Sequence, residues 1–333
     1  SGWRAELQAL HADGVTRTDD GLAAPGVDPR AGLRSGSVSL QVAGTPLAGW
    51  RTRVLLGRST DDYETISSAI PPDWVEIGTI GTVQRQLAWE NTLATPAGTL
   101  LLLAERVEQS VTKPGAPFDV AERHIDALAA GLNGRAGAHH WQASVRRDRN
   151  SQFGHQTTGA LAYGLDIAPA WRASASAGTS FVAPSFNLLY YPGWSNPALL
   201  PEEGEHGELA LQWTGQMASA RLAWFDNRIR GWITPGPAPV NVPRTRVSGW
   251  TASADGRWAG WRWSASLDHL DPRNVTEGSP QQGLLLPRRA RDSLRLAADG
   301  RVGPVELGAT LAAFGHRFDD AANTVRLAGY RTL

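Results

Sequence analysis

The chain contains no cysteine, a single methionine and no formal net charge, and each scarcity narrows what it can be. Without cysteine there is no disulfide framework, thiolate metal site or cysteine nucleophile, and the lack suits a protein exported through an oxidising periplasm. A balanced charge, with a pI of about 7.1, lacks the basic field that attracts nucleic acid. We therefore expect neither a disulfide-rich domain nor a nucleic-acid partner.

The sequence also lacks any apolar run that approaches the roughly 18 residues needed for a membrane-spanning helix. Its 333 residues are nevertheless 41% hydrophobic and 19% charged, which is too apolar for a disordered chain. The 14 tryptophans and 36 glycines are typical of membrane barrels, in which aromatic girdles flank the lipid band. If this chain lies in a bilayer, it must cross with strands.

The clearest pattern is a strict alternation between Trp171 and Phe181. One set of side chains is Trp, Ala, Ala, Ala, Thr and Phe, and the other is Arg, Ser, Ser, Gly and Ser. A period of two predicts a strand, here with a bulky apolar face and a small polar face. Such a strand suits lipid on its outer side and water on its inner side.

The same alternation recurs along the whole chain in about sixteen strands. Short turns, such as LNGRAG between strands expected at 118–131 and 137–149, alternate with longer loops, such as 183–203. This arrangement is typical of outer-membrane barrels, with short periplasmic turns and long extracellular loops. The sequence therefore predicts an all-β, antiparallel up-and-down transmembrane β-barrel. A soluble propeller of hairpins is the alternative, but no fixed repeat length appears.

Six arginines lie on the strand faces opposite the bulky apolar residues. Exposing them to lipid would cost roughly 2–4 kcal/mol each at the bilayer midplane, so we expect them to point into the lumen. They are Arg51, Arg172, Arg221, Arg257, Arg262 and Arg295.

Motifs for catalysis are missing: there is no G-x-S-x-G, H-E-x-x-H or G-x-x-x-x-G-K-[ST]. His139 and His140 are neighbours on a predicted strand, so they point to opposite faces and cannot share a metal. The acidic stretch 202–206 could be read as a metal cluster, but we favour a structural role where a loop enters a strand. The prediction is a protein that is not an enzyme.

Four segments carry a resemblance to a known family. The stretch GTSFVAPSFNLLYY with NPALLPEEGEHGELALQW, within 178–213, resembles a signature of TonB-dependent outer-membrane receptors. The segments STDDYE (59–64), RRDRNSQFGHQTT (146–158) and LLLPRRARDSL (284–294) are similar, in order and approximate spacing, to the cobalamin (vitamin B12) receptors of that superfamily.

This resemblance implies a barrel of 22 strands with an N-terminal plug in its lumen, in the bacterial outer membrane. The sixteen strands here would correspond to the fifth through the twentieth. We therefore expect residues 1–333 to form one partial barrel domain, with the plug outside this sequence, and to adopt an open sheet curved like part of a barrel. The complete protein is expected to be a monomer.

The function implied by the resemblance is capture of a corrinoid (cobalamin) on the extracellular side and import with energy from the TonB complex. Two alternatives remain at this point. One is a receptor of the same superfamily for a ferric siderophore or haem, and the other is a plugless diffusion porin.

The resemblance also assigns ligand-binding positions to this sequence. Arg288 matches a family arginine at the start of the Arg-Arg-Ala run, where a guanidinium could donate hydrogen bonds to corrinoid amides or phosphate. Thr79 lies within one residue of a family threonine contact, and Gly21 takes the place of a loop residue that touches ligand. The alternative for Arg288 is a solvated arginine at the mouth of the lumen.

Calcium is the metal implied by the resemblance, because family members use it to order extracellular loops. Asp20 and Asp28 match ligand positions, and Asp19 replaces a tyrosine; carboxylate oxygens are what a hard cation prefers. The alternative is that these aspartates only stabilise an exposed turn. No cofactor is expected to be required.

Overall fold

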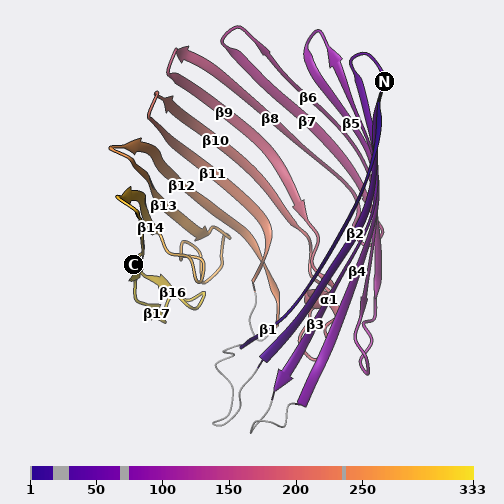
Figure 1. The fold of residues 1–333 in the computed structure, drawn as a ribbon. Coiled ribbons are helices and arrows are strands. Elements are labelled where there is room, and N and C mark those ends of the chain that lie inside the picture. The colour runs from indigo at the N-terminus through magenta and orange to yellow at the C-terminus, as the bar shows by residue number, and fades with distance from the viewer. Residues whose placement is uncertain (1, 18–29, 68–74, 235–237) are drawn as a thin grey trace.

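The computed structural model describes every residue except 1, 18–29, 68–74 and 235–237, and its central feature is one antiparallel sheet of sixteen strands (Figure 1). Each strand pairs with its chain neighbours, in the order β1 to β15 and then β18. The first eight are β1 (Trp3–Arg17), β2 (Arg30–Leu47), β3 (Trp50–Ser67), β4 (Val75–Thr95), β5 (Gly98–Thr112), β6 (Glu122–Ala136), β7 (His139–Asn150) and β8 (Gly154–Ala168). The others are β9 (Trp171–Val182), β10 (Glu202–Thr214), β11 (Ala218–Thr234), β12 (Val240–Trp258), β13 (Trp261–Asn274), β14 (Asp292–Val302), β15 (Val305–Phe314) and β18 (Tyr330–Thr332).

Three short elements lie in the loops. They are the helix α1 (Phe186–Tyr190) and the two-stranded hairpin of β16 (Arg317–Phe318) with β17 (Arg326–Leu327). Among the described residues, no helix has the length and hydrophobicity needed to cross a membrane.

Short turns lie at one end of the sheet, and the connections at the other end are longer, as predicted, except for the three residues between β7 and β8. Figure 1 shows the turns along the upper edge of the sheet and α1 near the lower. The strands run to 21 residues in β4. At about 3.3 Å per residue, such a strand is much longer than the 9–11 or so residues needed to cross a bilayer. The strands therefore extend beyond the hydrocarbon.

One turn lies later than the sequence predicted. Instead of ending near 131, β6 continues to Ala136, and the turn is at Gly137, whose φ of +58° favours glycine. The expected turn residue Gly134 stays in the ladder opposite Trp141. A Cβ on Gly134 would lie 2.6 Å from the Trp141 ring, so the missing side chain gives this indole room to lie across the strand.

The sheet has an apolar face and a polar face, and the register assigns all six arginines named above to the polar one. For example, Arg172 and Arg221 both lie opposite Gln212, and Arg257 lies opposite Arg262. The apolar face carries most of the large exposed hydrophobic side chains, including Leu7, Leu40, Leu56, Leu87, Trp89, Leu128, Leu161, Leu209, Leu222 and Trp258. The predicted face assignment of these six is confirmed.

The polar face is the concave one. Helix α1 follows β9, yet Phe186 of this helix packs against Val111 of β5, four strands away in the sheet. A loop can span that separation only if the sheet curves around it, so the face that carries Val111 lines the lumen. The sheet does not close: β1 and β18 form its two edges. This confirms the expected open sheet.

Tryptophans mark the apolar face at two levels. Near the turns Trp171 lies opposite Trp213, and Trp258 lies opposite Trp261. Farther along the strands Trp224 lies opposite Trp250, which also stacks on His269 at 6.0 Å between ring centroids. Indoles at two heights are the pattern of aromatic girdles at the two interfaces of a bilayer.

Candidate functional site: the lumen and its loop cover

Two loops pack together over the luminal wall at the loop end of the sheet. Their apolar centre consists of Val111, Phe118 and Phe186, which are 2%, 6% and 8% exposed. Phe118 meets Tyr191 edge to face, with ring centroids 6.4 Å apart. This small core holds the loop after β9 against the wall of β5, and so narrows the mouth of the lumen.

Helix α1 begins where the sequence provides a cap. The Ser185 side chain accepts a hydrogen bond from the Leu188 N–H at 3.3 Å, and Leu189 is 1% exposed beneath the helix. The helix ends at Tyr190, two residues before Pro192, which has no N–H to continue it.

Two asparagines lock the loop after α1 to β11 and β12. The Asn196 amide donates to the Pro239 carbonyl at 3.0 Å, and its own N–H donates to Leu188 O at 2.8 Å. Asn241 both accepts from the Leu200 N–H at 2.9 Å and donates to the Leu200 carbonyl at 3.0 Å. The NPALLPEE segment is therefore a structural clamp, and Asn241, which no motif pointed to, completes it.

A luminal pocket of about 510 Å³ lies under this loop cover. Hydroxyl and amide side chains dominate its wall: Ser35, Ser37, Ser59, Thr82, Gln84 and Gln109. Its one arginine, Arg123, is 9% exposed and already donates to Gln109 Oε1 at 2.9 and 3.0 Å and to the Pro184 carbonyl at 3.0 Å. One carboxylate, Asp61, also lines the wall and accepts from the Ser35 hydroxyl at 2.9 Å. Apart from Asp61 and Arg123, the pocket presents neutral hydrogen-bonding groups.

Arg288 lies at the loop end, between β13 and β14, as its place in the sequence predicted. Its backbone has a φ of +58°, and its N–H donates to the Phe318 carbonyl at 2.6 Å. Its Nε donates to Asp319 Oδ1 at 2.7 Å, while the side chain remains 73% exposed. The guanidinium is thus oriented by one carboxylate and open to solvent.

The neighbouring Arg289 has a structural role. Its guanidinium lies 4.4 Å from the centre of the Trp232 ring, and burial lowers its pKa from the ordinary value. The two arginines of the Arg-Arg-Ala run therefore differ: Arg289 packs on an indole of β11, and Arg288 faces solvent.

Thr79 lies on β4, opposite Glu64 of β3, in the same outward-facing alternation set as Leu87 and Trp89. Its chain neighbour Ile80 faces the other way and packs against the loop core. The structure does not bring Thr79 and Arg288 onto neighbouring strands.

Gly21 and the aspartates Asp19, Asp20 and Asp28 lie outside the described residues, so ligand contact at Gly21 and calcium binding stay predictions.

The predicted behaviour of the histidine pair is confirmed. His139 Nδ1 lies 2.5 Å from the Tyr163 hydroxyl, and His140 Nε2 lies 2.9 Å from Asp166 Oδ2 on the opposite face. In the 202–206 stretch, Glu202 accepts from the Ile233 N–H at 2.6 Å, whereas Glu205 pairs with Arg230. Within the described ranges, no three His, Asp or Glu residues are placed to hold a metal ion.

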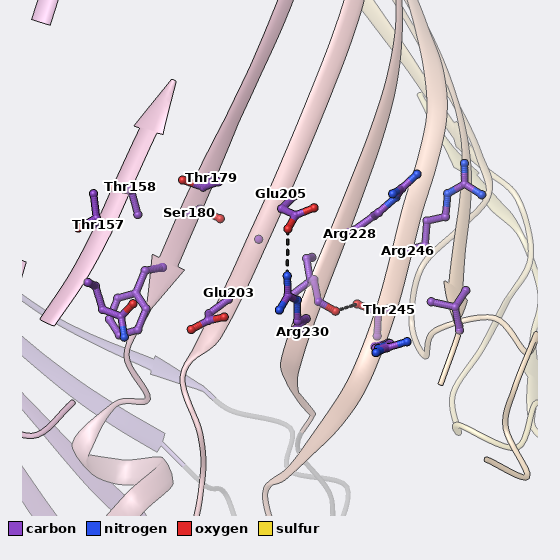
Figure 2. Close-up of a pocket in the computed structure, with 16 residues that line it drawn as sticks. Thr157, Thr158, Thr179, Ser180, Glu203, Glu205, Arg228, Arg230, Thr245 and Arg246 are labelled. Atoms are coloured by element: carbon purple, nitrogen blue, oxygen red, sulfur yellow. Dashed lines mark hydrogen bonds and ion pairs between the residues drawn. The ribbon is translucent and has the colours of Figure 1, made fainter. Parts of the chain in front are cut away.

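A second polar feature lies on the apolar face, farther from the turns than Trp224 and Trp250. Figure 2 shows five of its residues: Glu203, Glu205, Arg228, Arg230 and Arg246. We call it the paired belt: Glu203, Glu205, Asp226, Arg228, Arg230, Arg244 and Arg246. Each of its arginines has a carboxylate: Arg230 pairs with Glu205 at 3.0 Å, Arg228 with Asp226 at 3.2 Å, Arg246 with Asp226 and Arg244 with Glu277 at 3.9 Å.

The belt shows that strand arginines do not all face the lumen. The midplane cost that places Arg221 inside does not apply where β10 to β12 extend past the hydrocarbon. The sequence signal was available, since Arg228 and Arg230 alternate in step with Trp224.

Comparisons with known proteins agree with this geometry. The family described as TonB dependent receptor-like, beta-barrel matches residues 15–333. The vitamin B12 transporter BtuB of Photobacterium profundum is 26% identical over 339 residues, which cover 98% of this chain and 54% of that protein. The chain thus spans about half the length of this curated relative.

Solved structures show the same fold. The ferric yersiniabactin uptake receptor FyuA of Yersinia pestis has a TM-score of 0.74 at 15% identity, covering 99% of this chain and 59% of that one. The ferric-catecholate import receptor Fiu of E. coli K12 has a TM-score of 0.76 at 12% identity, covering 99% and 65%. At such identities the likeness concerns the fold alone.

The matched family consists of transport receptors and not of enzymes. A curved antiparallel sheet with an apolar outer face, a polar lumen and a loop cover at one end is the wall that such a receptor needs. Taken with the match over residues 15–333, these features show that the chain belongs to the TonB-dependent receptor β-barrel family of the bacterial outer membrane.

Proposed function

We propose that this chain forms the barrel wall of a receptor that binds a corrinoid at the outer surface and imports it with energy from the TonB complex. The observation that carries the proposal is the 26% identity to a vitamin B12 transporter, which extends over 98% of this chain. That extent includes both the wall and the loop cover.

The chemistry of the luminal pocket supports this ligand class. A corrinoid carries several neutral amide side chains, and the wall offers the matching amides and hydroxyls of Ser37, Ser59, Gln84 and Gln109. An anionic iron–siderophore complex would favour free cationic groups. Arg123 is the cation in this pocket, and its hydrogen bonds to Gln109 and Pro184 already occupy it.

Arg288 is the proposed anchor at the mouth. Its exposed guanidinium can donate to a corrinoid phosphate or amide while Asp319 holds its Nε. Gly21 is proposed as a further contact, and calcium at Asp19, Asp20 and Asp28 would order the loop that carries Gly21. Thr79 is not included, because its side of β4 is the outward-facing one.

The test compares two arginines in the protein expressed from its complete gene. Arg288→Ala should weaken cobalamin binding by roughly 1.5–3 kcal/mol, the usual scale for a hydrogen bond to a charged group. Arg257→Ala is the matched control, because this luminal arginine lies next to the turn at the opposite end of the sheet. Its affinity should be unchanged in the same titration.

The other outcomes are informative. Equal losses in both variants would indicate a general folding defect, and an unchanged Arg288→Ala affinity would remove the residue-level link. Tight binding of a ferric siderophore or haem, with none of cobalamin, would replace this proposal with the alternative receptor class. Ligand diffusion without TonB would indicate a porin.

A further inference from the structure

A groove of about 650 Å³ crosses the outer wall over β3 to β8 and has two chemically different ends. Its apolar end is lined by Leu87, Trp89 and Leu128, which are 47%, 52% and 67% exposed on the lipid-facing side of the sheet. Its charged end is lined by Arg106, Asp126, Arg147, Arg149 and His155. We call this feature the unpaired groove.

The register places the charged end directly against the apolar end. Arg147 on β7 lies opposite Leu128 on β6, and Arg149 lies opposite Asp126 on β6 and His155 on β8. Two residues apart on one strand face, the Cα atoms of Arg147 and Arg149 are separated by about 7 Å. Two exposed guanidiniums therefore flank the same small area at the end of the apolar surface.

The two nearby carboxylates, those of Asp126 and Glu108, already form ion pairs with Arg106. Arg106 binds Asp126 at 3.1 Å and Glu108 at 3.0 Å. Neither Arg147 nor Arg149 makes a hydrogen bond or ion pair within the part of the chain that the structure describes. Three arginines therefore stand against the two carboxylates of Asp126 and Glu108, and the charged end carries an excess of positive charge.

The adjoining strands extend this imbalance. Arg58 on β3 lies directly opposite Arg85 on β4, and both are exposed. The other cross-strand neighbour of Arg85 is Glu108 on β5, whose carboxylate binds Arg106. Like charges in a cross-strand pair repel, and neither arginine has a partner among the described residues. An anion outside the protein would relieve this repulsion.

We infer that the unpaired groove is a binding site for a lipid of the outer leaflet that carries a phosphate headgroup and acyl chains. The phosphate would accept charge-assisted hydrogen bonds from Arg147 and Arg149. The acyl chains would lie along Leu87, Trp89 and Leu128. The charged end of the groove lies toward the loop end of β7 and β8, at the edge of the apolar band, where the headgroups of the outer leaflet are located.

The inference is independent of the transported ligand, because these side chains are on the face opposite the lumen. The two ends of the groove also distinguish a lipid from a free anion as the ligand. Inorganic phosphate could use the arginines but would gain nothing from the apolar end, whereas a lipid uses both ends.

The test uses the protein expressed from its complete gene, purified in non-ionic detergent and titrated with lipid A, a phosphorylated acylated glycolipid. Lipid A should bind more tightly than zwitterionic phosphatidylcholine, and an excess of inorganic phosphate should not displace it. The double variant Arg147→Ala/Arg149→Ala should lose about tenfold or more in lipid A affinity, the effect of removing two charge-assisted hydrogen bonds.

Two further variants control for charge and folding. Arg228→Ala/Arg230→Ala removes the same charge from the paired belt and should change lipid A affinity by about twofold or less, because those arginines are neutralised by carboxylates. Arg147→Lys/Arg149→Lys keeps the charge and should retain most of the binding. Heat-modifiable migration in a gel checks that every variant is folded.

Three results would overturn the inference. The first is equal loss of lipid A in the two alanine variants, which would indicate a general charge effect. The second is equal binding of phosphatidylcholine and lipid A, and the third is displacement of lipid A by inorganic phosphate.

Discussion

The paired belt and the unpaired groove contain the same kinds of residue on the same face of the sheet, yet they are electrostatically different. In the belt, Asp226 serves both Arg228 and Arg246, and Glu205 serves Arg230. In the groove, Arg106 takes Asp126 and leaves Arg149 without a carboxylate. Composition alone therefore does not decide whether a basic cluster is satisfied; the cross-strand neighbours decide it.

The difference separates two uses of arginine at a membrane surface. Paired guanidiniums are already neutralised by carboxylates of the chain and gain little from an additional anion. Unpaired guanidiniums beside an apolar surface form an incomplete site, and they are stabilised by a partner that supplies negative charge. The belt is thus a structural rim, and the groove is a candidate site.

The largest expected effect concerns the lipid-facing surface next to each of the two regions. It tests whether both surfaces lie in the hydrocarbon of the bilayer. Leu161→Arg on β8 and Leu222→Arg on β11 each place a cation on the lipid-facing surface, where the leucines are 65% and 54% exposed. Each should destabilise the protein by roughly 2–4 kcal/mol in urea unfolding from lipid vesicles. Gln142→Arg, on the luminal face of β7, is the control and should have little effect. A similar loss for Gln142→Arg would contradict the assigned faces.

A smaller effect is expected when the belt is made to resemble the groove. Asp226→Asn removes the carboxylate shared by Arg228 and Arg246, whose side chains are 68% and 46% exposed. The loss of stability should be about 1 kcal/mol or less, since exposed ion pairs contribute little. The same variant should gain affinity for lipid A, measured by the titration used for the groove. A variant that loses stability and gains no lipid binding would mean that unpaired arginines are insufficient.

The smallest expected effect concerns a carboxylate that accepts hydrogen bonds from N–H and hydroxyl groups and pairs with no arginine of the described chain. Asp320, in the loop between β16 and β17, accepts from the Val325 N–H at 2.8 Å and from the Thr324 hydroxyl and N–H, and these bonds lower its pKa from 3.8 to about 2. Because the folded pKa is depressed, the stabilisation is complete above about pH 4 and is lost as pH falls through about 2. Pepsin cleavage within 319–325 should therefore increase from pH 4 to pH 2.

The matched variant for this loop is Asp320→Asn, which cannot accept the same set of hydrogen bonds. Its loop should be cleaved at both pH values, and the difference between pH 4 and pH 2 should disappear. Cleavage of the unaltered loop that does not depend on pH would contradict the assigned role of Asp320.

Much of the candidate site could be anticipated because its signals are local. The loop-end place of Arg288 was predicted in this way from adjacent residues. The cap at Ser185 and the end of α1 before Pro192 are also local features, but residues 183–203 were expected to be a loop without a helix. The turn after β6 was placed too early, because a glycine in a turn and a glycine beneath an indole look alike in sequence. Gly134 is of the second kind, because Trp141, seven residues later in the chain, lies across it in the folded sheet.

The sequence by itself determined the sixteen strands, their meander order and the luminal side of Arg51, Arg172, Arg221, Arg257, Arg262 and Arg295. A period of two is a property of consecutive residues, so it can be read without knowing any neighbour strand. Tertiary structure alone decided that Phe186 packs on Val111, that Asp319 orients Arg288 and that Asp126 pairs with Arg106. These contacts depend on the register between strands and on the curvature of the sheet, which bring together residues that are far apart in the chain.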